Sequence, residues 1–384
     1  MPPYHPAMER KGRVAKATHV GIPDGLTEEE HGRAAFAGPV SHLYRTVPAT
    51  AWVDVDGPLR PLALDLNRLA PPDAEDAEAG RTLLLHNADL RVSLSRRRAP
   101  TPYAVRNADG DEVVFVHHGA GVLQTDFGPL DYSAGDYLVI PRGVVHRWVP
   151  DGAESFLLVV ESTAAVTLPD FGPLLGRHAV VDPSVVATPE PWSEPPADWD
   201  GGAEGRWRVR AQRLGEWTTF TYPHNPFTAV GWAGDLAPWR LHTSDIRPIG
   251  SHRFHLPPSV HTTFRCGRFD IATFVPRPFE TDPESLRVPF FHANVDNDEV
   301  IFYSRGDFFS RKGIGEGWLT LHPQGAPHGP QPGAAERAAT KTMADEIAVM
   351  IECVAPLTVA DGVKTAEDPD YVTSWARGMG LVDG

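Results

Sequence analysis

The feature that most restricts the fold of this sequence is a pair of short patterns that occurs twice. In the first half, residues 112–119 read E-x6-G and residues 135–146 read G-x5-P-x-G-x2-H. In the second half, residues 299–306 and 317–328 repeat both patterns in the same order. Self-similarity of this kind indicates an internal duplication, so we expect two copies of one domain.

The segments that carry these patterns have the composition of β-strands. Residues 111–119, 135–141, 298–306 and 317–323 are runs of β-branched and aromatic side chains bounded by Gly and Pro. The 35 glycines and 38 prolines follow no short period, which suits many strands joined by tight turns. Helical periodicity is sparse, although we expect residues 341–354 to begin as a short helix and end as a strand. The predicted fold class is all-β, with few short helices.

The two halves are separated by a stretch rich in proline, glycine and acidic residues, residues 183–205. This composition is typical of a linker or a surface excursion. We therefore predict an N-terminal domain over residues 1–182 and a C-terminal domain over residues 206–384.

Composition excludes several classes of protein. The net charge is −15, from 35 basic and 50 acidic residues, and an acidic surface repels phosphate backbones. Two cysteines, Cys266 and Cys353, exclude a disulfide framework and a thiolate metal cluster. No apolar run reaches the ~18 residues of a membrane-spanning helix, and residues 1–16 lack the apolar segment of a signal peptide. We expect a cytoplasmic protein that binds neither nucleic acid nor membrane.

A candidate metal site lies in the second copy. His292 lies seven residues before Glu299, and the second pattern ends at His328. Alternate residues of a strand share one face, so inward side chains of neighbouring strands converge. Two imidazoles and one carboxylate on one face of an octahedral ion leave three positions open, as in non-haem Fe(II) oxygenases. We predict that these residues bind Fe(II); the competing interpretation is three buried polar residues that bind no metal.

The first copy lacks one of these ligands. Val105 stands in the place of His292 and cannot bind a metal. Glu112 and His146 alone would make a weak site, so we predict that the N-terminal domain holds no metal and serves structure and assembly.

Two further histidines lie near the candidate site in the sequence. His322 precedes His328 in the same predicted hairpin, and His255 lies upstream within SHRFHLPPSVHTTF. Histidine is the usual general base near neutral pH, which makes both candidates for catalysis. The other histidines of this half are assigned structural roles: His224, His242, His252 and His261.

The repeated patterns resemble the two motifs of the cupin superfamily, of which the first runs G-x5-H-x-H-x(3,4)-E-x6-G. This resemblance implies that each half folds as a cupin-type double-stranded β-helix, or jelly-roll barrel. Asn294 stands where the superfamily has the second histidine of its H-x-H pair, and an amide is a poor metal ligand.

Most of the chain also resembles the homogentisate 1,2-dioxygenase family. The matching segments are SHLYRTVPAT (41–50), DEVVFVHHGAGVLQTDFGPLDYSAGDYLVIPRGVVHRW (111–148), NPFTAVGW (225–232), HLPPSVHTTF (255–264), FFHANVDNDEVIFYSRGDF (290–308) and LHPQGAPHGP (321–330). The resemblance implies an enzyme of aromatic amino-acid catabolism that converts homogentisate and O2 into maleylacetoacetate. It also implies a homo-oligomer, a trimer or a hexamer.

The same resemblance implies roles for single residues. His292, Glu299 and His328 match the iron ligands. His255 matches the base that takes a proton from the substrate hydroxyl, and His322 matches a histidine that contacts substrate or oxygen. We add Asn294 and Phe308 to the expected substrate-binding residues.

Two departures from the family pattern leave the substrate open. Ala293 replaces an arginine after the first ligand, and Phe308 replaces a substrate-contacting tyrosine. Gentisate or a substituted hydroquinone is therefore an alternative substrate. A metal-dependent bicupin isomerase or decarboxylase, and a storage barrel without activity, are alternatives of other classes.

Overall fold

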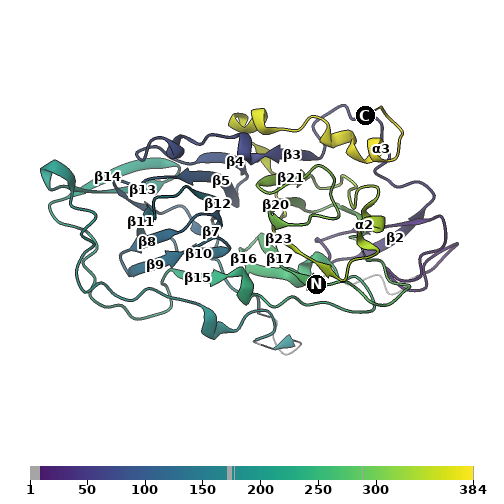
Figure 1. The fold of residues 1–384 in the computed structure, drawn as a ribbon, viewed down its shortest axis with the longest axis horizontal. Coiled ribbons are helices and arrows are strands. Elements are labelled where there is room, and N and C mark those ends of the chain that lie inside the picture. The colour runs from purple at the N-terminus through teal and green to yellow at the C-terminus, as the bar shows by residue number, and fades with distance from the viewer. Residues whose placement is uncertain (1–8, 171–174, 177, 288, 384) are drawn as a thin grey trace.

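The computed structural model of this chain describes residues 9–170, 175–176, 178–287 and 289–383. Strands dominate it and form two barrels, one mainly blue and teal and the other mainly green in Figure 1, as the sequence predicted. Helices are short, also as predicted: α2 (Ala334–Ala338) and α3 (Ser374–Gly378), with 3-10 segments at 66–68, 72–74, 183–185, 202–204, 243–245, 258–261, 361–366 and 371–373.

The N-terminal barrel is made of two sheets. One has the order β15-β10-β7-β12-β5-β4-β24 and the other the order β14-β13-β6-β11-β8-β9. Their bounds are β4 (Thr82–His86), β5 (Leu90–Arg97), β6 (Ala104–Asn107), β7 (Asp111–His118), β8 (Gly121–Thr125), β9 (Gly128–Tyr132), β10 (Asp136–Ile140), β11 (Val145–Pro150), β12 (Ser155–Ser162), β13 (Trp207–Arg213), β14 (Glu216–Tyr222), β15 (Trp239–His242) and β24 (Thr358–Val359).

The C-terminal barrel combines a sheet of order β16-β17-β23-β20-β21-β3 with a sheet of order β19-β1-β2. Strands β18 and β22 form a separate two-stranded ribbon. Their bounds are β1 (Thr27–Gly32), β2 (Val40–Arg45), β3 (Leu62–Asp65), β16 (Thr262–Arg265), β17 (Phe269–Phe274), β18 (Arg277–Pro278), β19 (Phe291–Asn294), β20 (Asp298–Gly306), β21 (Trp318–His322), β22 (Met343–Ala344) and β23 (Glu346–Cys353).

The two barrels exchange strands across the predicted domain boundary. Strands β1, β2 and β3 come from the first 65 residues but pair with β19 and β21 of the C-terminal barrel. Conversely, β13 pairs with β6, and β15 pairs with β10, in the N-terminal barrel. The domain boundary at residues 183–205 stays a prediction. Strands from both sides of it take part in each barrel.

The helix expected at the start of residues 341–354 is wrong. Residues 343–344 form β22 and residues 346–353 form β23, whose eight residues are all buried. Because β23 pairs with both β17 and β20 and lies in the middle of its sheet, its apolar run shows no alternation.

One apolar core joins the two barrels. Phe115 of β7 contacts Phe302 of β20, with ring centroids 6.2 Å apart. Tyr137 of β10 packs against Phe264 of β16, and its hydroxyl lies 2.9 Å from that of Thr273 on β17. These contacts between the sheets fix the orientation of the barrels.

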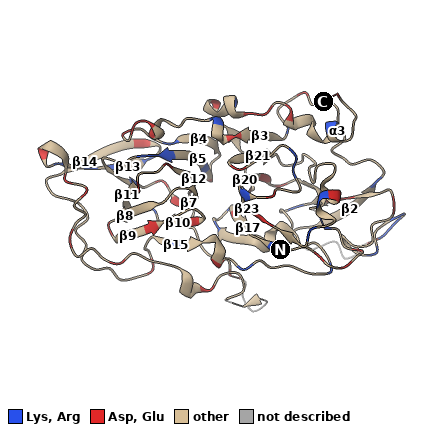
Figure 2. Cartoon of the chain, viewed as in Figure 1, with Lys and Arg blue, Asp and Glu red and all other residues tan. Residues whose placement is uncertain are grey.

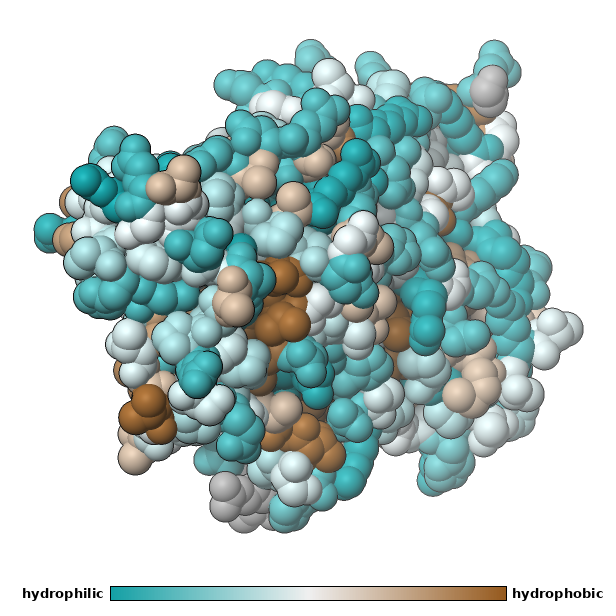
Figure 3. All heavy atoms as spheres, turned by 60° about the vertical axis from the view of Figure 1, so that its left-hand side comes forward, coloured by the Kyte–Doolittle hydropathy of each residue, from teal (hydrophilic) through white to brown (hydrophobic). Residues whose placement is uncertain are grey.

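The surface carries charges of both signs. Acidic and basic residues are interspersed along the ribbon of Figure 2, and the face in Figure 3 is mainly hydrophilic with a few apolar groups. Within the described ranges, none of the helices has the length and apolar character needed to cross a membrane.

Candidate metal centre

Three segments of the C-terminal barrel bring the predicted ligands together. His292 lies on β19, Glu299 lies on β20, and His328 follows β21 in the turn 323–328. The backbones of His292 and His328 exchange two hydrogen bonds, with N···O distances of 2.8 and 2.9 Å. This isolated bridge holds the two imidazoles side by side, with ring centroids 4.1 Å apart.

The ligand atoms converge on one point inside the barrel. Glu299 Oε2 lies 3.5 Å from His292 Nε2, and Glu299 Oε1 lies 3.3 Å from His328 Nε2. All three residues are buried, and their ligand atoms lie within 4.8 Å of one another. Two imidazoles and a carboxylate around one centre are the donor set that the sequence predicted.

Each imidazole is held so that its Nε2 atom is free for a metal. The Nδ1 atom of His292 lies 3.1 Å from the carbonyl oxygen of Phe290, and that of His328 lies 3.0 Å from the carbonyl oxygen of Ala326. Donation to these carbonyls places the proton on Nδ1 and leaves the Nε2 lone pair facing Glu299. Both Nε2 atoms are buried without a hydrogen-bond partner, a cost of about 1–3 kcal/mol each unless a cation accepts their lone pairs. The residues therefore fit a divalent metal ion.

The charges of the site also suit a cation. Burial alone would raise the pKa of Glu299, but the surrounding imidazoles hold that pKa well below its usual range. Burial lowers the pKa of His328, which favours its neutral form. An ionised carboxylate beside neutral imidazole is the protonation state that a metal requires of its ligands.

The N-terminal barrel shows what fills the equivalent place without a metal. Arg81 Nη2 donates to Glu112 at 2.8 Å and to Glu161 at 3.2 Å, so a guanidinium bridges two buried carboxylates. His146 Nε2 stays 3.9 Å from Glu112. The absence of metal from this barrel stays a prediction, and the arginine gives it a physical reason.

The C-terminal barrel has the same pair of carboxyl groups without an arginine. Glu352 lies opposite Glu299 in the register of β23 and β20, as Glu161 lies opposite Glu112. Burial raises the pKa of Glu352 well above its usual range, and the neighbouring charge of Glu299 raises it further. Among the residues that the structure describes, no basic side chain forms an ion pair with Glu352.

His322 lies against Glu299, and its predicted contact with substrate stays a prediction. It lies opposite Glu299 in the register of β20 and β21, and its Nδ1 atom is 2.8 Å from Glu299 Oε1. Its Nε2 atom is 2.9 Å from the hydroxyl of Tyr371, a residue of the C-terminal segment that sequence reasoning missed. Both ring nitrogens have protein partners and the side chain is fully buried, so this geometry favours positioning of Glu299.

A cavity opens from the metal site toward the predicted base. His255, Phe290 and Arg311 line it together with His292 and Glu299. His255 Nδ1 lies 2.8 Å from a carboxylate oxygen of Glu280, a buried partner that no sequence motif indicated. The structure thus places His255 where its free Nε2 atom can meet a ligand in the cavity.

The two other expected substrate contacts are not among the residues that line this cavity. Phe308 is buried in an apolar cluster, where it packs against Tyr303 at 5.0 Å. Asn294 is also buried, and both polar atoms of its side chain lack a hydrogen-bond partner. Their predicted roles stay predictions. Phe308 has no hydroxyl group, but its neighbour Tyr303 has one and lines the cavity.

Comparison with known proteins decides the family. The profile described as homogentisate 1,2-dioxygenase N-terminal matches residues 94–242, and the C-terminal profile of the same family matches residues 253–380. A candidate dioxygenase of Saccharolobus solfataricus is 32% identical, over 97% of this chain and 98% of its own length. The chain belongs to the homogentisate 1,2-dioxygenase family.

Relatives named for this activity are more distant. The homogentisate 1,2-dioxygenase of Dictyostelium discoideum is 26% identical, over 97% of this chain and 94% of its own length. That of Bradyrhizobium diazoefficiens is 29% identical, and the match covers 70% of this chain and 62% of the relative. Membership of this family supports a ring-cleaving dioxygenase with a metal in its active site.

Proposed function

We propose that this chain is an Fe(II)-dependent dioxygenase that cleaves the ring of homogentisate or a related para-diphenol. The observation that carries the proposal is the pair of buried, unpartnered Nε2 atoms of His292 and His328. They face Glu299, which lines a cavity together with His292. Two imidazoles and one carboxylate with open positions are the donor set of non-haem Fe(II) oxygenases.

The bound iron would supply open coordination positions at which an electron-rich ring and O2 meet. The residues of the chain supply binding and proton handling. His255 Nε2 takes the proton of a substrate hydroxyl, because Glu280 accepts a hydrogen bond from Nδ1–H and so fixes the tautomer that leaves Nε2 free. The apolar wall of the cavity, which includes Phe290 and Ile301, keeps water away from the reacting ring.

Arg311 favours a substrate that carries a carboxylate. Its Nε atom donates to the hydroxyl of Tyr303 at 3.1 Å, and its Nη1 atom donates to the carbonyl of Gly329 at 2.7 Å. No carboxylate of the described residues pairs with this guanidinium, although it is buried against the cavity. Homogentisate and gentisate both carry an acid group that this charge would bind.

The test is oxygen uptake by protein loaded with Fe(II) under anaerobic conditions. The panel contains homogentisate, gentisate, catechol and hydroquinones with and without an acid group. We expect rapid uptake with one acid-bearing para-diphenol, loss of uptake in His292→Ala, and normal uptake in the control His224→Ala, whose side chain is exposed. Stoichiometric iron without uptake on any ring would overturn the proposal.

We also propose a homo-oligomer, a trimer or a hexamer, in the cytoplasm. Strand β14 is an edge strand, and six of its seven residues are exposed, including Trp217 and Phe220. Edge strands with exposed aromatic residues are common sites of association between copies. Light scattering coupled to size exclusion measures the oligomer, and a monomer at micromolar concentration would contradict it.

A further inference from the structure

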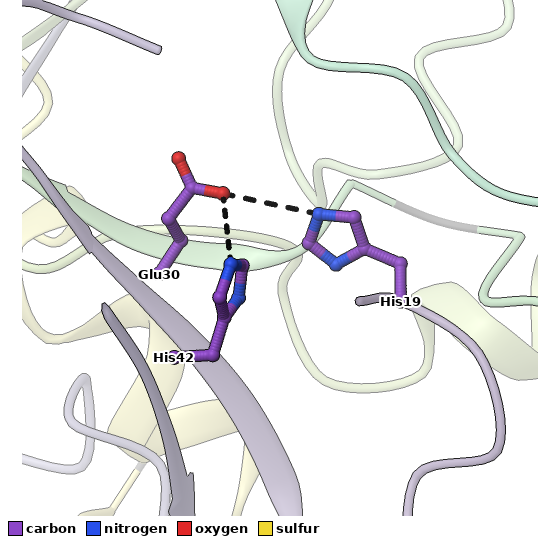
Figure 4. Close-up of side chains that lie close together, drawn as sticks. All are labelled: His19, Glu30 and His42. Atoms are coloured by element: carbon purple, nitrogen blue, oxygen red, sulfur yellow. Dashed lines mark ion pairs between the residues drawn. The ribbon is translucent and has the colours of Figure 1, made fainter. Parts of the chain in front are cut away.

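A second group of metal-binding side chains lies in the N-terminal segment, outside the centre described above. His19, Glu30 on β1 and His42 on β2 point toward one another, as Figure 4 shows. Glu30 Oε2 lies 3.9 Å from His19 Nε2 and 3.8 Å from His42 Nε2. The ligand atoms of all three lie within 4.8 Å of one another, as they do at the predicted iron site.

Glu28 lies behind both imidazoles of this cluster: it hydrogen-bonds that of His19, whereas Nδ1 of His42 has no hydrogen-bond partner. Its Oε2 atom lies 2.8 Å from His19 Nδ1, and its Oε1 atom lies 3.5 Å from His42 Nδ1. The hydroxyl of Tyr44 donates to the same carboxylate at 2.7 Å, which holds it in place. Both Nδ1 atoms thus face one carboxylate and both Nε2 atoms face the other. A carboxylate behind the imidazole is the usual partner of a metal-binding histidine.

The local backbone is arranged to build this cluster. Strands β1 and β2 are antiparallel, with Glu30 opposite His42 and Glu28 opposite Tyr44. Because alternate residues of a strand share a face, all four side chains project to one side. His19 reaches the cluster with a φ of 61°, in the left-handed region that residues with a Cβ rarely adopt. Such strain is retained where the surrounding structure fixes the residue, often at functional sites.

The cluster contains two buried carboxyl groups. Glu28 and Glu30 are both buried, with 3% and 8% of their surface exposed. Within the described part of the chain, neither carboxylate pairs with lysine or arginine, since Arg45 pairs with Glu29 instead. A divalent cation would balance the two carboxylates.

We propose that His19 Nε2, His42 Nε2 and the Glu30 carboxylate form a second metal site for a divalent transition-metal cation such as Zn²⁺. Two imidazoles and one carboxylate are common zinc ligands, and water completes the coordination. Glu28 does not bind the ion but orients the imidazole of His19.

The position of this site gives it a structural task. Glu30 lies opposite His292 in the register of the parallel pair β1 and β19. The ring of His19 stacks on Phe290, with centroids 4.1 Å apart and planes within 17°. Phe290 in turn lines the cavity of the predicted iron site. A metal at the second site would fasten the first strands of the chain to the strand that carries an iron ligand.

The experiment measures metal stoichiometry in the full chain, with the predicted iron site removed. The variant H292A/H328A is stripped of metal and titrated with Zn²⁺ by calorimetry and with Co²⁺ by visible absorption. We expect about one equivalent to bind and the melting temperature to rise with Zn²⁺. The substitutions Glu30→Gln and His42→Gln in this background should abolish both effects. Glu28→Gln should weaken binding about 10–100-fold, because an orienting partner is lost.

The matched control is His31→Gln, on the same strand but exposed, which should leave binding unchanged. Circular dichroism shows whether each variant folds, and His42→Gln tests the site if Glu30→Gln does not. The proposal is overturned if H292A/H328A binds no stoichiometric metal, or if folded Glu30→Gln and His42→Gln variants bind it unchanged. Because no activity is measured, failure here would leave the proposed dioxygenase function untouched.

Discussion

The partly buried Arg81 of the N-terminal barrel allows a quantitative prediction. Replacement of Arg81 by methionine keeps the apolar stem of the side chain and removes the guanidinium that bridges Glu112 and Glu161. Both carboxylates are almost fully buried, so their charges would lose their main partner without gaining water. We expect Arg81→Met to destabilise the protein at neutral pH.

The size of this loss of stability follows from the pKa values of Glu112 and Glu161. Burial alone would raise the pKa of Glu112, but Arg81, with His146, lowers it from 4.5 to about 2. That difference corresponds to about 3 kcal/mol, present above pH 4.5 and lost as the pH falls through about 2. The pKa of Glu161 is raised by burial despite Arg81, so it adds no stability of this kind. A loss of about 3 kcal/mol agrees with the usual cost of breaking a buried ion pair.

The assay is urea denaturation followed by circular dichroism between pH 2 and 7. Arg81→Met should unfold at lower urea than the wild type at pH 7, and the difference should shrink as the pH falls from 4.5 to 2. The double variant R81M/E112Q should recover part of the loss, because no unpaired carboxylate remains at position 112. A variant as stable as the wild type at pH 7, or a pH-independent loss, would refute the reasoning.

Three further predictions concern the predicted iron site. Glu280→Gln should lower oxygen uptake about 10²-fold, because His255 loses its orienting carboxylate. Unchanged uptake would contradict this. Arg311→Met should raise KM about 10–100-fold for acid-bearing substrates, because that factor corresponds to the free energy of one hydrogen bond to a charged group. The KM for an uncharged hydroquinone should not change. Equal effects on both substrates would exclude carboxylate binding. Tyr371→Phe should lower kcat about tenfold with little change in KM, because the hydrogen bond that holds His322 against Glu299 is lost. A change in KM alone would argue against a role of Tyr371 in positioning His322.

Local spacing made the strands, and the convergence of His292, Glu299 and His328, predictable from the sequence. The patterns around Glu299 and His328 each span one hairpin, and alternation along a strand places their inward residues without knowledge of the rest of the chain. The role of His322 was within reach of the same reasoning, since it faces Glu299 across that hairpin.

What could not be predicted depends on contacts between distant segments. Arg81, Glu280 and Tyr371 have no motif around them and reach their partners only after the barrels close. The exchange of β1, β2 and β3 into the C-terminal barrel was hidden for the same reason. Strand pairing across more than two hundred residues leaves no periodic signal in the sequence.

The exchanged strands also set an order in which the chain can fold during synthesis. Strand β1 is made first, but its parallel partner β19 lies some 260 residues later, roughly 13–50 s away at ordinary rates of translation. Most strands of the N-terminal barrel are made in that interval, whereas β1 and β3 still lack their partners β19 and β21. The strand that carries the predicted iron ligand His292 can therefore pair with β1 only after some 290 residues have been made. A chain whose synthesis stops before β19 cannot form the predicted iron site.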